Sequence, residues 1–342
     1  MIVLRGVFMR SLRAVFEWFQ NKSLNPAFGQ PLSSSVCDQL RKMAPEYKVA
    51  LIQLYAKPVD AEDNFNRASI FIHAAAAQGA HLAVLPEYHL TSWIPRDPKF
   101  KEICAQWSVF LARYQGLAAE CDISIVPGTI VELHKDEVTG EETLQNVAYF
   151  IDNGGKILSR YQKKNLWHPE RKHLVSSTYD PHDAFDTPLG KVGLLVCWDL
   201  AFPEAFRELI AKGAKTVIIP TFWGINDCSE YARNLNLRTE ALLLESMLTA
   251  RAFENTCCVI FVNAGAPPGD LENGAYAGLS RVTLPFVGAK GEETMKTTAE
   301  GMSIVTIDME IVEEAEKNYR VRADLGAEGW HYTYRHEDKS RL

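Results

Sequence analysis

Cys197 is a candidate nucleophile in the stretch GLLVCWDLAFPE, where a hydrophobic run meets a segment that begins with a proline. The run predicts a buried strand, and Pro203 fits the first turn of a helix. A sharp strand-to-helix turn presents a nucleophile to a cleft, and nearby backbone N–H groups favour the thiolate. Free cysteine is also among the most buried residue types. Taken alone, the stretch favours a packed core thiol.

Two further polar residues stand at the ends of expected strands. Glu87 ends HLAVLPE, and a carboxylate directly after a buried strand is costly unless it is paired or used. Lys163 and Lys164 lie in RYQKKNLWHPER, and on a strand only one of two neighbours can face a cleft. Alone, Glu87 is read more simply as a helix cap or a salt-bridge partner, and the lysines as solvated residues of an edge strand.

The elements around these residues predict an α/β fold with mixed strands in one large domain. Asp60 is the expected N-cap and Gly79 the expected stop of a helix whose buried face includes Phe65 and Ile72. We expect helices over 60–80, from Pro203 onward and over about 231–254, and strands over 47–54, 81–87, 124–133, 146–152, 156–164, 191–196, 215–221 and 257–264, with DNGG at 152–155 as a hairpin turn.

Taken together, the three stretches resemble the motifs of the carbon–nitrogen hydrolase (nitrilase) superfamily, whose catalytic Glu, Lys and Cys occur in this order. LAVLPE looks like its glutamate motif, and GLLVCWDLAFPE looks like its cysteine motif. YQKKNLW resembles its Tyr-x-Lys-x-x-Leu motif, which selects Lys163 rather than Lys164. The resemblance extends from about residue 47 to 320. It implies a four-layer α-β-β-α sandwich that pairs into a homodimer or a higher homo-oligomer.

The resemblance also implies roles for these residues. Glu87 would act as general base and acid and Cys197 as nucleophile, while Lys163 and the backbone N–H of Trp198 would stabilise the oxyanion. Glu170 matches a second glutamate that positions the substrate in many members. The simpler interpretation of Glu170 is a loop carboxylate paired with Arg171. No metal and no organic cofactor is needed.

The substrate class follows only in part from the sequence. The expected substrate is a small molecule: an amide, a ureido (N-carbamoyl) compound or a nitrile. True nitrilases tend to have Glu where this chain has Asp199, so amides and carbamoyl groups are favoured and a nitrile is the alternative. Carbamoyl amino acids are disfavoured because no basic residue stands at Leu200 or Ala201.

The walls of the pocket are harder to assign. Trp93, Phe222 and Trp223 are candidate pocket-wall residues, although core packing explains each of them equally well. A catalytically silent binding or docking protein on the same fold is the rival class of function. The complete set of glutamate, lysine and cysteine argues against it.

Composition narrows the partners. The chain has 342 residues with a net charge of −7, which argues against nucleic acid. Its seven cysteines are irregularly spaced, which predicts a reducing, cytoplasmic compartment rather than disulfides or zinc. No apolar run is long enough for a membrane span.

The two ends of the chain differ from its middle. Residues 1–46 carry six Lys or Arg and three Asp or Glu, which predicts a basic N-terminal extension for docking or for mitochondrial targeting. A hydrolase domain over 47–342 follows. The C-terminal tail resembles the segment that crosses to a partner subunit in family dimers.

Overall fold

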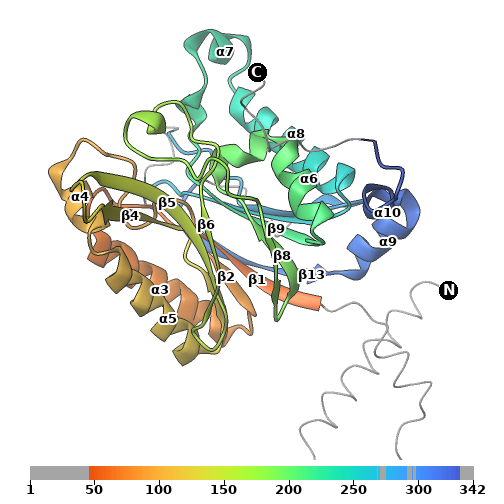
Figure 1. Ribbon diagram of the computed structural model, residues 1–342, viewed down its shortest axis with the longest axis horizontal. Helices are drawn as coiled ribbons and strands as arrows, with labels where there is room; N and C mark the ends of the chain where they lie inside the picture. The colour runs from red at the N-terminus through yellow and green to blue at the C-terminus, as the bar shows by residue number, and fades with distance from the viewer. Residues whose placement is uncertain (1–45, 268, 270–274, 291–294, 296–297, 332–342) are drawn as a thin grey trace, which may run out of the picture. The chain divides into compact units, whose positions relative to one another are not determined.

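The computed structural model describes residues 46–267, 269, 275–290, 295 and 298–331 (Figure 1). The predicted extension over 1–46 lies outside the described residues except for Glu46, and so does the tail beyond residue 331. Among the described helices, none combines the length and the apolar character needed to cross a bilayer. The described chain confirms the α/β prediction, with interleaved helices and two mixed sheets.

The first sheet has the strand order β13-β1-β2-β3-β5-β4, with β6 paired to β5. The second has the order β12-β11-β10-β9-β8-β7. Parallel pairs join β1 to β2 to β3 and β8 to β9 to β10 at the centres of the two sheets, and antiparallel pairs extend their edges. The strands are β1 Glu46–Gln53, β2 Leu82–Val84, β3 Ser124–Val126, β4 Thr129–Lys135, β5 Glu142–Ile151, β6 Ile157–Gln162, β7 Ala184–Thr187, β8 Gly190–Leu194, β9 Thr216–Thr221, β10 Cys258–Asn263, β11 Arg281–Leu284, β12 Gly288–Ala289 and β13 Gly301–Asp308.

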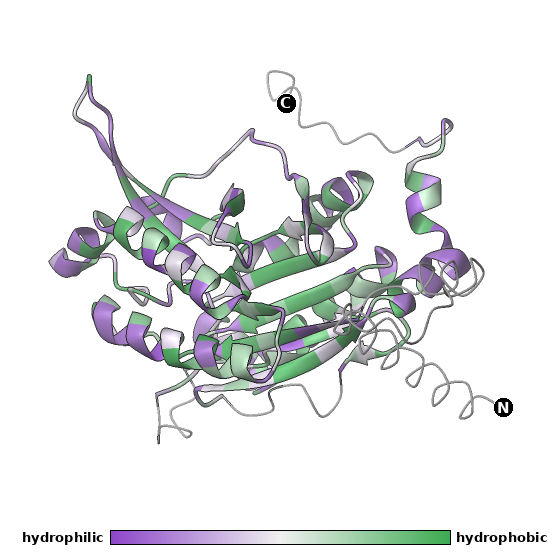
Figure 2. Cartoon of the chain, turned by 90° about the horizontal axis from the view of Figure 1, so that it is seen from below, coloured by the Kyte–Doolittle hydropathy of each residue, from purple (hydrophilic) through white to green (hydrophobic). Residues whose placement is uncertain are grey.

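Alternating side chains on β1 explain how the layers stack. Val49 and Leu51 join the hydrophobic core between the two sheets, whereas Ala50 and Ile52 join a second core under the helices. Successive residues of a strand point to opposite faces, so a strand buried on both faces reads as one continuous apolar run. The result is the predicted four-layer α-β-β-α sandwich, whose strands are largely hydrophobic in Figure 2.

Helices cover the outer face of each sheet (Figure 1). Helices α3 and α5 pack on the first sheet, and α6 and α8 pack beside the second. Of the tail, α10 contacts α6 of the same chain. The helices are α3 Ala61–Ala77, α4 Pro98–Cys104, α5 Trp107–Cys121, α6 Pro203–Ala211, α7 Glu230–Leu235, α8 Thr239–Glu254, α9 Glu310–Tyr319 and α10 Val321–Leu325, and the short 3-10 turns are η1 Glu170–Lys172, η2 Cys197–Ala201 and η3 Ile225–Asp227.

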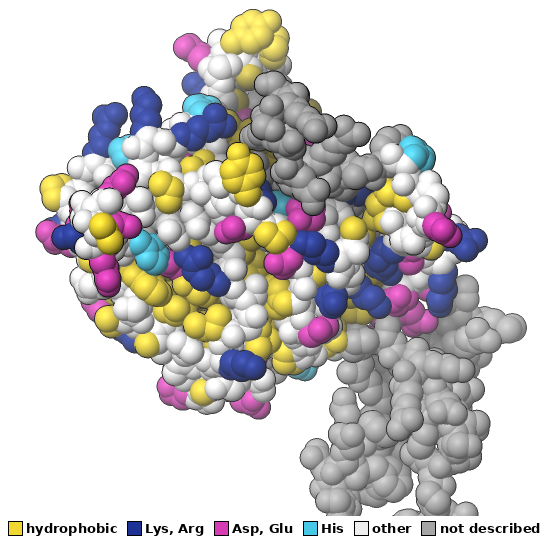
Figure 3. Space-filling view, in the orientation of Figure 1, with side chains coloured by type: hydrophobic (Ala, Val, Ile, Leu, Met, Phe, Trp, Pro, Cys, Tyr) yellow, Lys and Arg dark blue, Asp and Glu magenta, His cyan; other side chains and the backbone are white. Residues whose placement is uncertain are grey.

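Two predictions about these elements need comment. Asp60 caps α3 by accepting a hydrogen bond from the Asp63 N–H, as predicted. The single helix predicted over 231–254 is wrong, because α7 and α8 are separate. Asn236 is extended, and its side chain accepts a hydrogen bond from the Arg238 N–H, which favours a turn over a continuing helix. Apolar side chains lie exposed on and just after α7, and they form the hydrophobic cluster at the upper tip of Figure 3.

Gly128 explains why the strand predicted over 124–133 is divided into β3 and β4. Its φ is +62°, and a Cβ atom there would lie 1.8 Å from the carbonyl oxygen of Pro86. Only glycine permits this close approach together with a left-handed backbone. The β3–β4 bend therefore packs directly on the end of the segment that carries Glu87.

Candidate active site

Cys197 occupies the predicted sharp turn between a strand and a helix. Its φ is +47°, a left-handed backbone that residues other than glycine rarely adopt. The turn η2 begins at Cys197, and α6 begins with Pro203. Such strain persists only where surrounding contacts enforce it, and it is concentrated at functional sites. Cys197 is 7% exposed and faces a cavity.

Asp199 holds this turn in place. Its buried carboxylate accepts hydrogen bonds from the Val196 N–H at 2.9 Å and the Tyr161 hydroxyl at 2.8 Å. It also accepts from both the backbone and the side chain of Asn165, at 2.9 and 2.8 Å. Asn165 lies two residues after Lys163, so the carboxylate ties the cysteine turn to the lysine loop. No local pattern in the sequence indicated the bonds of Asp199 to Tyr161 and Asn165.

Lys163 is brought between two carboxylates. Its Nζ lies 2.9 Å from Oε1 of Glu87 and 2.8 Å from Oε1 of Glu170, and its side chain is 1% exposed. Lys164 instead donates to the carbonyl of Asp180 at the surface, so Lys163 is the lysine that enters the site. Arg171 donates to a backbone carbonyl at Leu166. The simpler pairing of Glu170 with Arg171 is therefore wrong.

Two residues that the sequence did not single out complete this network. The Asn146 amide donates to Glu87 Oε1 at 2.8 Å and to the Tyr88 hydroxyl at 3.0 Å. The Tyr88 hydroxyl in turn donates to Oε1 of Glu170. The other Glu87 oxygen accepts from the Phe222 N–H at 3.0 Å. No local pattern in the sequence indicated Asn146 or Tyr88, because their partners are far away along the chain.

Burial and charge set the protonation states of the three central groups. Burial, reinforced by the charge of Glu170, raises the pKa of Glu87 to about 7 despite the opposing charge of Lys163. Burial would lower the pKa of Lys163, but Glu87 and Glu170 hold it well above its ordinary value. Burial and the charge of Glu87 raise the pKa of the Cys197 thiol well above its usual range.

One expectation from the sequence holds in direction but not in net effect. Nearby backbone N–H groups were expected to favour the Cys197 thiolate, and both Lys163 and the Phe222 N–H do oppose the rise in pKa. Burial outweighs that attraction, so the resting cysteine is a neutral thiol. It lies within hydrogen-bonding reach of Glu87, whose pKa near neutrality suits a group that accepts and returns a proton.

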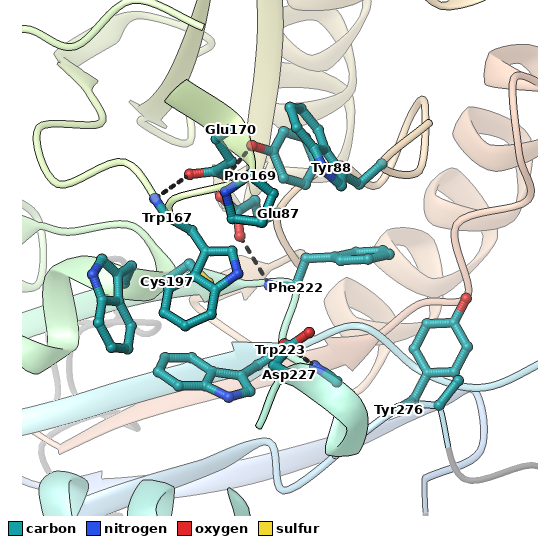
Figure 4. Close-up of a pocket in the computed structure, with 14 residues that line it drawn as sticks. Glu87, Tyr88, Trp167, Pro169, Glu170, Cys197, Phe222, Trp223, Asp227 and Tyr276 are labelled. Carbon is teal, nitrogen blue, oxygen red and sulfur yellow. Dashed lines mark hydrogen bonds between the residues drawn. The ribbon is translucent and has the colours of Figure 1, made fainter. Parts of the chain in front are cut away.

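The cavity in front of Cys197 has a volume of about 270 Å³ and a largely aromatic wall (Figure 4). All three predicted wall residues, Trp93, Phe222 and Trp223, line it, as does Trp198. The sequence did not indicate the remaining lining residues, which are Tyr88, Trp167, Pro169, Gly224, Asp227, Ala275 and Tyr276. Leu200 and Ala201 do not line it, and their carbonyls accept hydrogen bonds from Arg251.

Comparison with known proteins identifies the family. The sequence model of the family described as carbon-nitrogen hydrolase matches residues 48–317, most of the chain. The chain belongs to the carbon–nitrogen hydrolase family. Within this carbon–nitrogen hydrolase, the matched range contains Glu87, Lys163 and Cys197 together with both sheets.

Relatives include both amidases and a protein named as a nitrilase. The hydrolase is 29% identical to deaminated glutathione amidase of Bos taurus over 86% of this chain and 89% of that one. It is 27% identical to a "probable nitrilase" of Schizosaccharomyces pombe over 79% of this chain and 92% of the other. Its distant relatives thus include amidases that act on small-molecule amides.

One solved structure is related in both fold and sequence. It is a mutant of the amidase from Nesterenkonia sp. AN1, with the acetamide moiety of fluoroacetamide added covalently at the active-site cysteine. The two chains share 26% identity with a TM-score of 0.62, over 82% of this chain and 97% of the other. Among the described residues of the present hydrolase, no group of three or more His, Cys, Asp or Glu side chains is arranged to hold a metal ion.

Proposed function

We propose that the protein hydrolyses a non-peptide carbon–nitrogen bond, in an amide or an N-carbamoyl group of a small molecule, through a thioester on Cys197. The observation that carries the proposal is that Cys197, Glu87 and Glu170 line one cavity, with Lys163 bonded to both glutamates. The neutral thiol stands beside a carboxylate whose pKa is about 7. Such a pair can transfer a proton at neutral pH.

The first half of the reaction forms the thioester. Glu87 takes the proton from Cys197 as Sγ attacks the carbonyl carbon, and the carbonyl oxygen becomes an oxyanion. Lys163, which is held positive by its two carboxylates, stabilises that oxyanion together with the Trp198 N–H. One such donor is typically worth about 3–4 kcal/mol. The C–N bond then breaks, and Glu87 gives its proton to the departing ammonia or amine.

The second half of the reaction regenerates the enzyme. Glu87 takes a proton from a water molecule, and the resulting hydroxide attacks the thioester carbon. The C–S bond breaks, the acid leaves, and Glu87 returns the proton to Sγ. Glu170 keeps Lys163 in position throughout, and it is itself fixed by the Tyr88 hydroxyl and the Trp167 N–H.

A nitrile is the second candidate substrate, and the relative named as a "probable nitrilase" favours it. Attack of Cys197 on a nitrile carbon gives a thioimidate instead of a tetrahedral oxyanion. The same three residues would then add water and release ammonia. The hydrogen bonds by which Asp199 stabilises the cysteine turn explain its presence, so Asp199 does not distinguish an amide substrate from a nitrile.

A panel of amides, ureido compounds and nitriles tests the proposal, with ammonia or amine release as the measurement. We expect turnover of an amide or ureido compound that disappears in Cys197→Ala. Cys228→Ala is the matched control, since Cys228 is a partly buried thiol outside the cavity lining whose sulfur donates to a nearby carbonyl. Turnover confined to nitriles would favour the second candidate. Undiminished turnover in Cys197→Ala, or no turnover of any compound, would contradict the proposal.

A further inference from the structure

Asp227 places a third carboxylate on the cavity wall, besides Glu87 and Glu170. It ends the turn η3, and its Oδ2 accepts a hydrogen bond from the Gly224 N–H at 2.8 Å. Its Oδ1 accepts no hydrogen bond from the described residues. In Figure 4 it lies beside Trp223, apart from Glu87 and Glu170. One oxygen therefore shapes the turn, and the other is available to a ligand.

The turn that carries Asp227 is fixed to the opposite strand segment. The Ile225 N–H donates to the Ala275 carbonyl at 3.1 Å, and the Ala277 N–H donates to the Trp223 carbonyl at 3.1 Å. One residue of each hydrogen bond, Trp223 or Ala275, lines the cavity. These two hydrogen bonds fix the position of the Asp227 carboxylate relative to the cavity.

Aromatic faces surround the same part of the cavity. The rings of Trp198 and Trp223 lie 5.5 Å apart, and those of Phe222 and Tyr276 lie 6.0 Å apart. The indole N–H of Trp223 donates to the buried carboxylate of Glu240 at 2.6 Å, which fixes the ring. Aromatic faces attract cations, tryptophan most strongly.

The charge of the described lining is acidic. Its ionisable members other than Cys197 and the two tyrosines are Glu87, Glu170 and Asp227, and it contains no Lys, Arg or His. Lys163 is not among the lining residues, and its Nζ is paired with both Glu87 and Glu170. Burial and the charge of Glu240 also raise the pKa of Asp227, against the Gly224 N–H and His168, which lower it. A carboxylate group on a substrate would therefore be repelled in this cavity.

We propose that the cavity takes amides whose far end carries an ammonium group, which the Asp227 carboxylate and the faces of Trp223 and its neighbouring rings hold. The proposal deepens the proposed amide hydrolysis and rests on it for the position of the reacting bond. The rival arrangement is an acidic substrate that reaches past Trp93 and Pro169. There a neighbouring hollow is lined by Arg96 and Lys172, both exposed at the surface.

A matched set of amides separates these arrangements. Straight-chain primary amides with three to five methylene groups would end in an ammonium, a methyl or a carboxylate group. Binding to the full chain carrying Cys197→Ala is measured by calorimetry, and kcat/KM is measured on the wild-type chain. We expect the ammonium compound to bind and react at least threefold better than its methyl counterpart, and the carboxylate compound to be the poorest, since one half-exposed ion pair contributes about that much.

Variants at the turn identify the residue responsible. Asp227→Asn keeps an acceptor for the Gly224 N–H but loses the charge, so the ratio of ammonium to methyl compound should fall about threefold to fivefold. Asp227→Lys should make the carboxylate compound the best of the three. Asn226→Lys adds one positive charge, the same change in charge as Asp227→Asn, but one residue away and outside the lining, and it should leave the ratio unchanged.

The outcomes distinguish this inference from the proposed function. Hydrolysis with no preference for the ammonium compound, or with a preference for the carboxylate compound that survives Asp227→Asn, overturns the inference and leaves amide hydrolysis standing. Selective binding of the ammonium compound that depends on Asp227, without hydrolysis of any amide, supports the inference for the pocket and refutes the proposed function.

Discussion

Replacing Glu170 by Gln should shift the pH at which the protein becomes active. Glu87 must be ionised to take the thiol proton, so activity should rise with pH through the pKa of Glu87, about 7, and be lost below it. The negative charge of Glu170 is one cause of that raised pKa. Removing the charge should therefore lower the pKa of Glu87 and move the acidic limb of the profile to lower pH.

The geometry gives the size of this shift. Both carboxylates bond the same Lys163 Nζ, at 2.9 and 2.8 Å. Two like charges about 5 Å apart repel by about 3 kcal/mol at an effective dielectric constant of about 20. If Lys163, lying between them, cancels about half of this, about 1.4 kcal/mol remains, which corresponds to one pH unit. We expect the limb to move from about pH 7 to about pH 6.

The assay is ammonia release, with kcat/KM measured from pH 5 to pH 9 at constant ionic strength on the best amide of the panel. Glu204→Gln removes the same charge from an exposed position in the first turn of α6, and its limb should not move. If the acidic limb of the kcat/KM profile of Glu170→Gln stays at the wild-type pH, the electrostatic coupling of the two glutamates is refuted, whatever the maximum value of kcat/KM.

Three further predictions concern the supports of the site. Asp199→Asn replaces an acceptor of four hydrogen bonds and should lower the free energy of unfolding by about 3 kcal/mol in a urea titration; a change below about 1 kcal/mol would contradict the role of Asp199 in holding the turn. Gly128→Ala puts a Cβ 1.8 Å from a backbone carbonyl and should cost far more than Gly140→Ala, which has the same sign of φ but open space around it; equal losses would refute the close packing. Tyr88→Phe removes one donor to a buried carboxylate and should cost about 1–3 kcal/mol of stability and lower kcat/KM, and an unchanged kcat/KM would show that this hydroxyl does not position the site.

The sequence predicted the central residues only in combination, because each stands at the end of an expected strand but has a simpler structural interpretation when taken alone. Reactive groups collect at the carboxyl ends of strands in open α/β sheets, but it was the resemblance of the three motifs to one family that brought Glu87, Lys163 and Cys197 together. Their order and spacing then matched one family. The left-handed φ of Cys197 follows from the predicted sharp turn and is found there.

Other parts of the site depend on contacts that no local pattern records. Asn146 stands in the middle of a strand and Asp227 in a short turn, and neither position differs in the sequence from many ordinary ones. The protonation of Cys197 could not be predicted either, because it depends on how far burial outweighs the charge of Lys163. At the break between α7 and α8, Asn236 is extended and its side chain accepts a hydrogen bond from the Arg238 N–H. The surrounding stretch has a composition typical of a helix, so its sequence did not indicate the break.

The partition of products in hydroxylamine tests the central claim, a thioester on Cys197, most directly. An amide and the methyl ester of the same acid would be hydrolysed by the full chain in the presence of hydroxylamine, and the ratio of hydroxamate to acid would be measured. Because both substrates give the same acylated Cys197, the account predicts the same ratio for both and loss of both products in Cys197→Ala. Ratios that differ with the leaving group, or products that persist in Cys197→Ala, would contradict it.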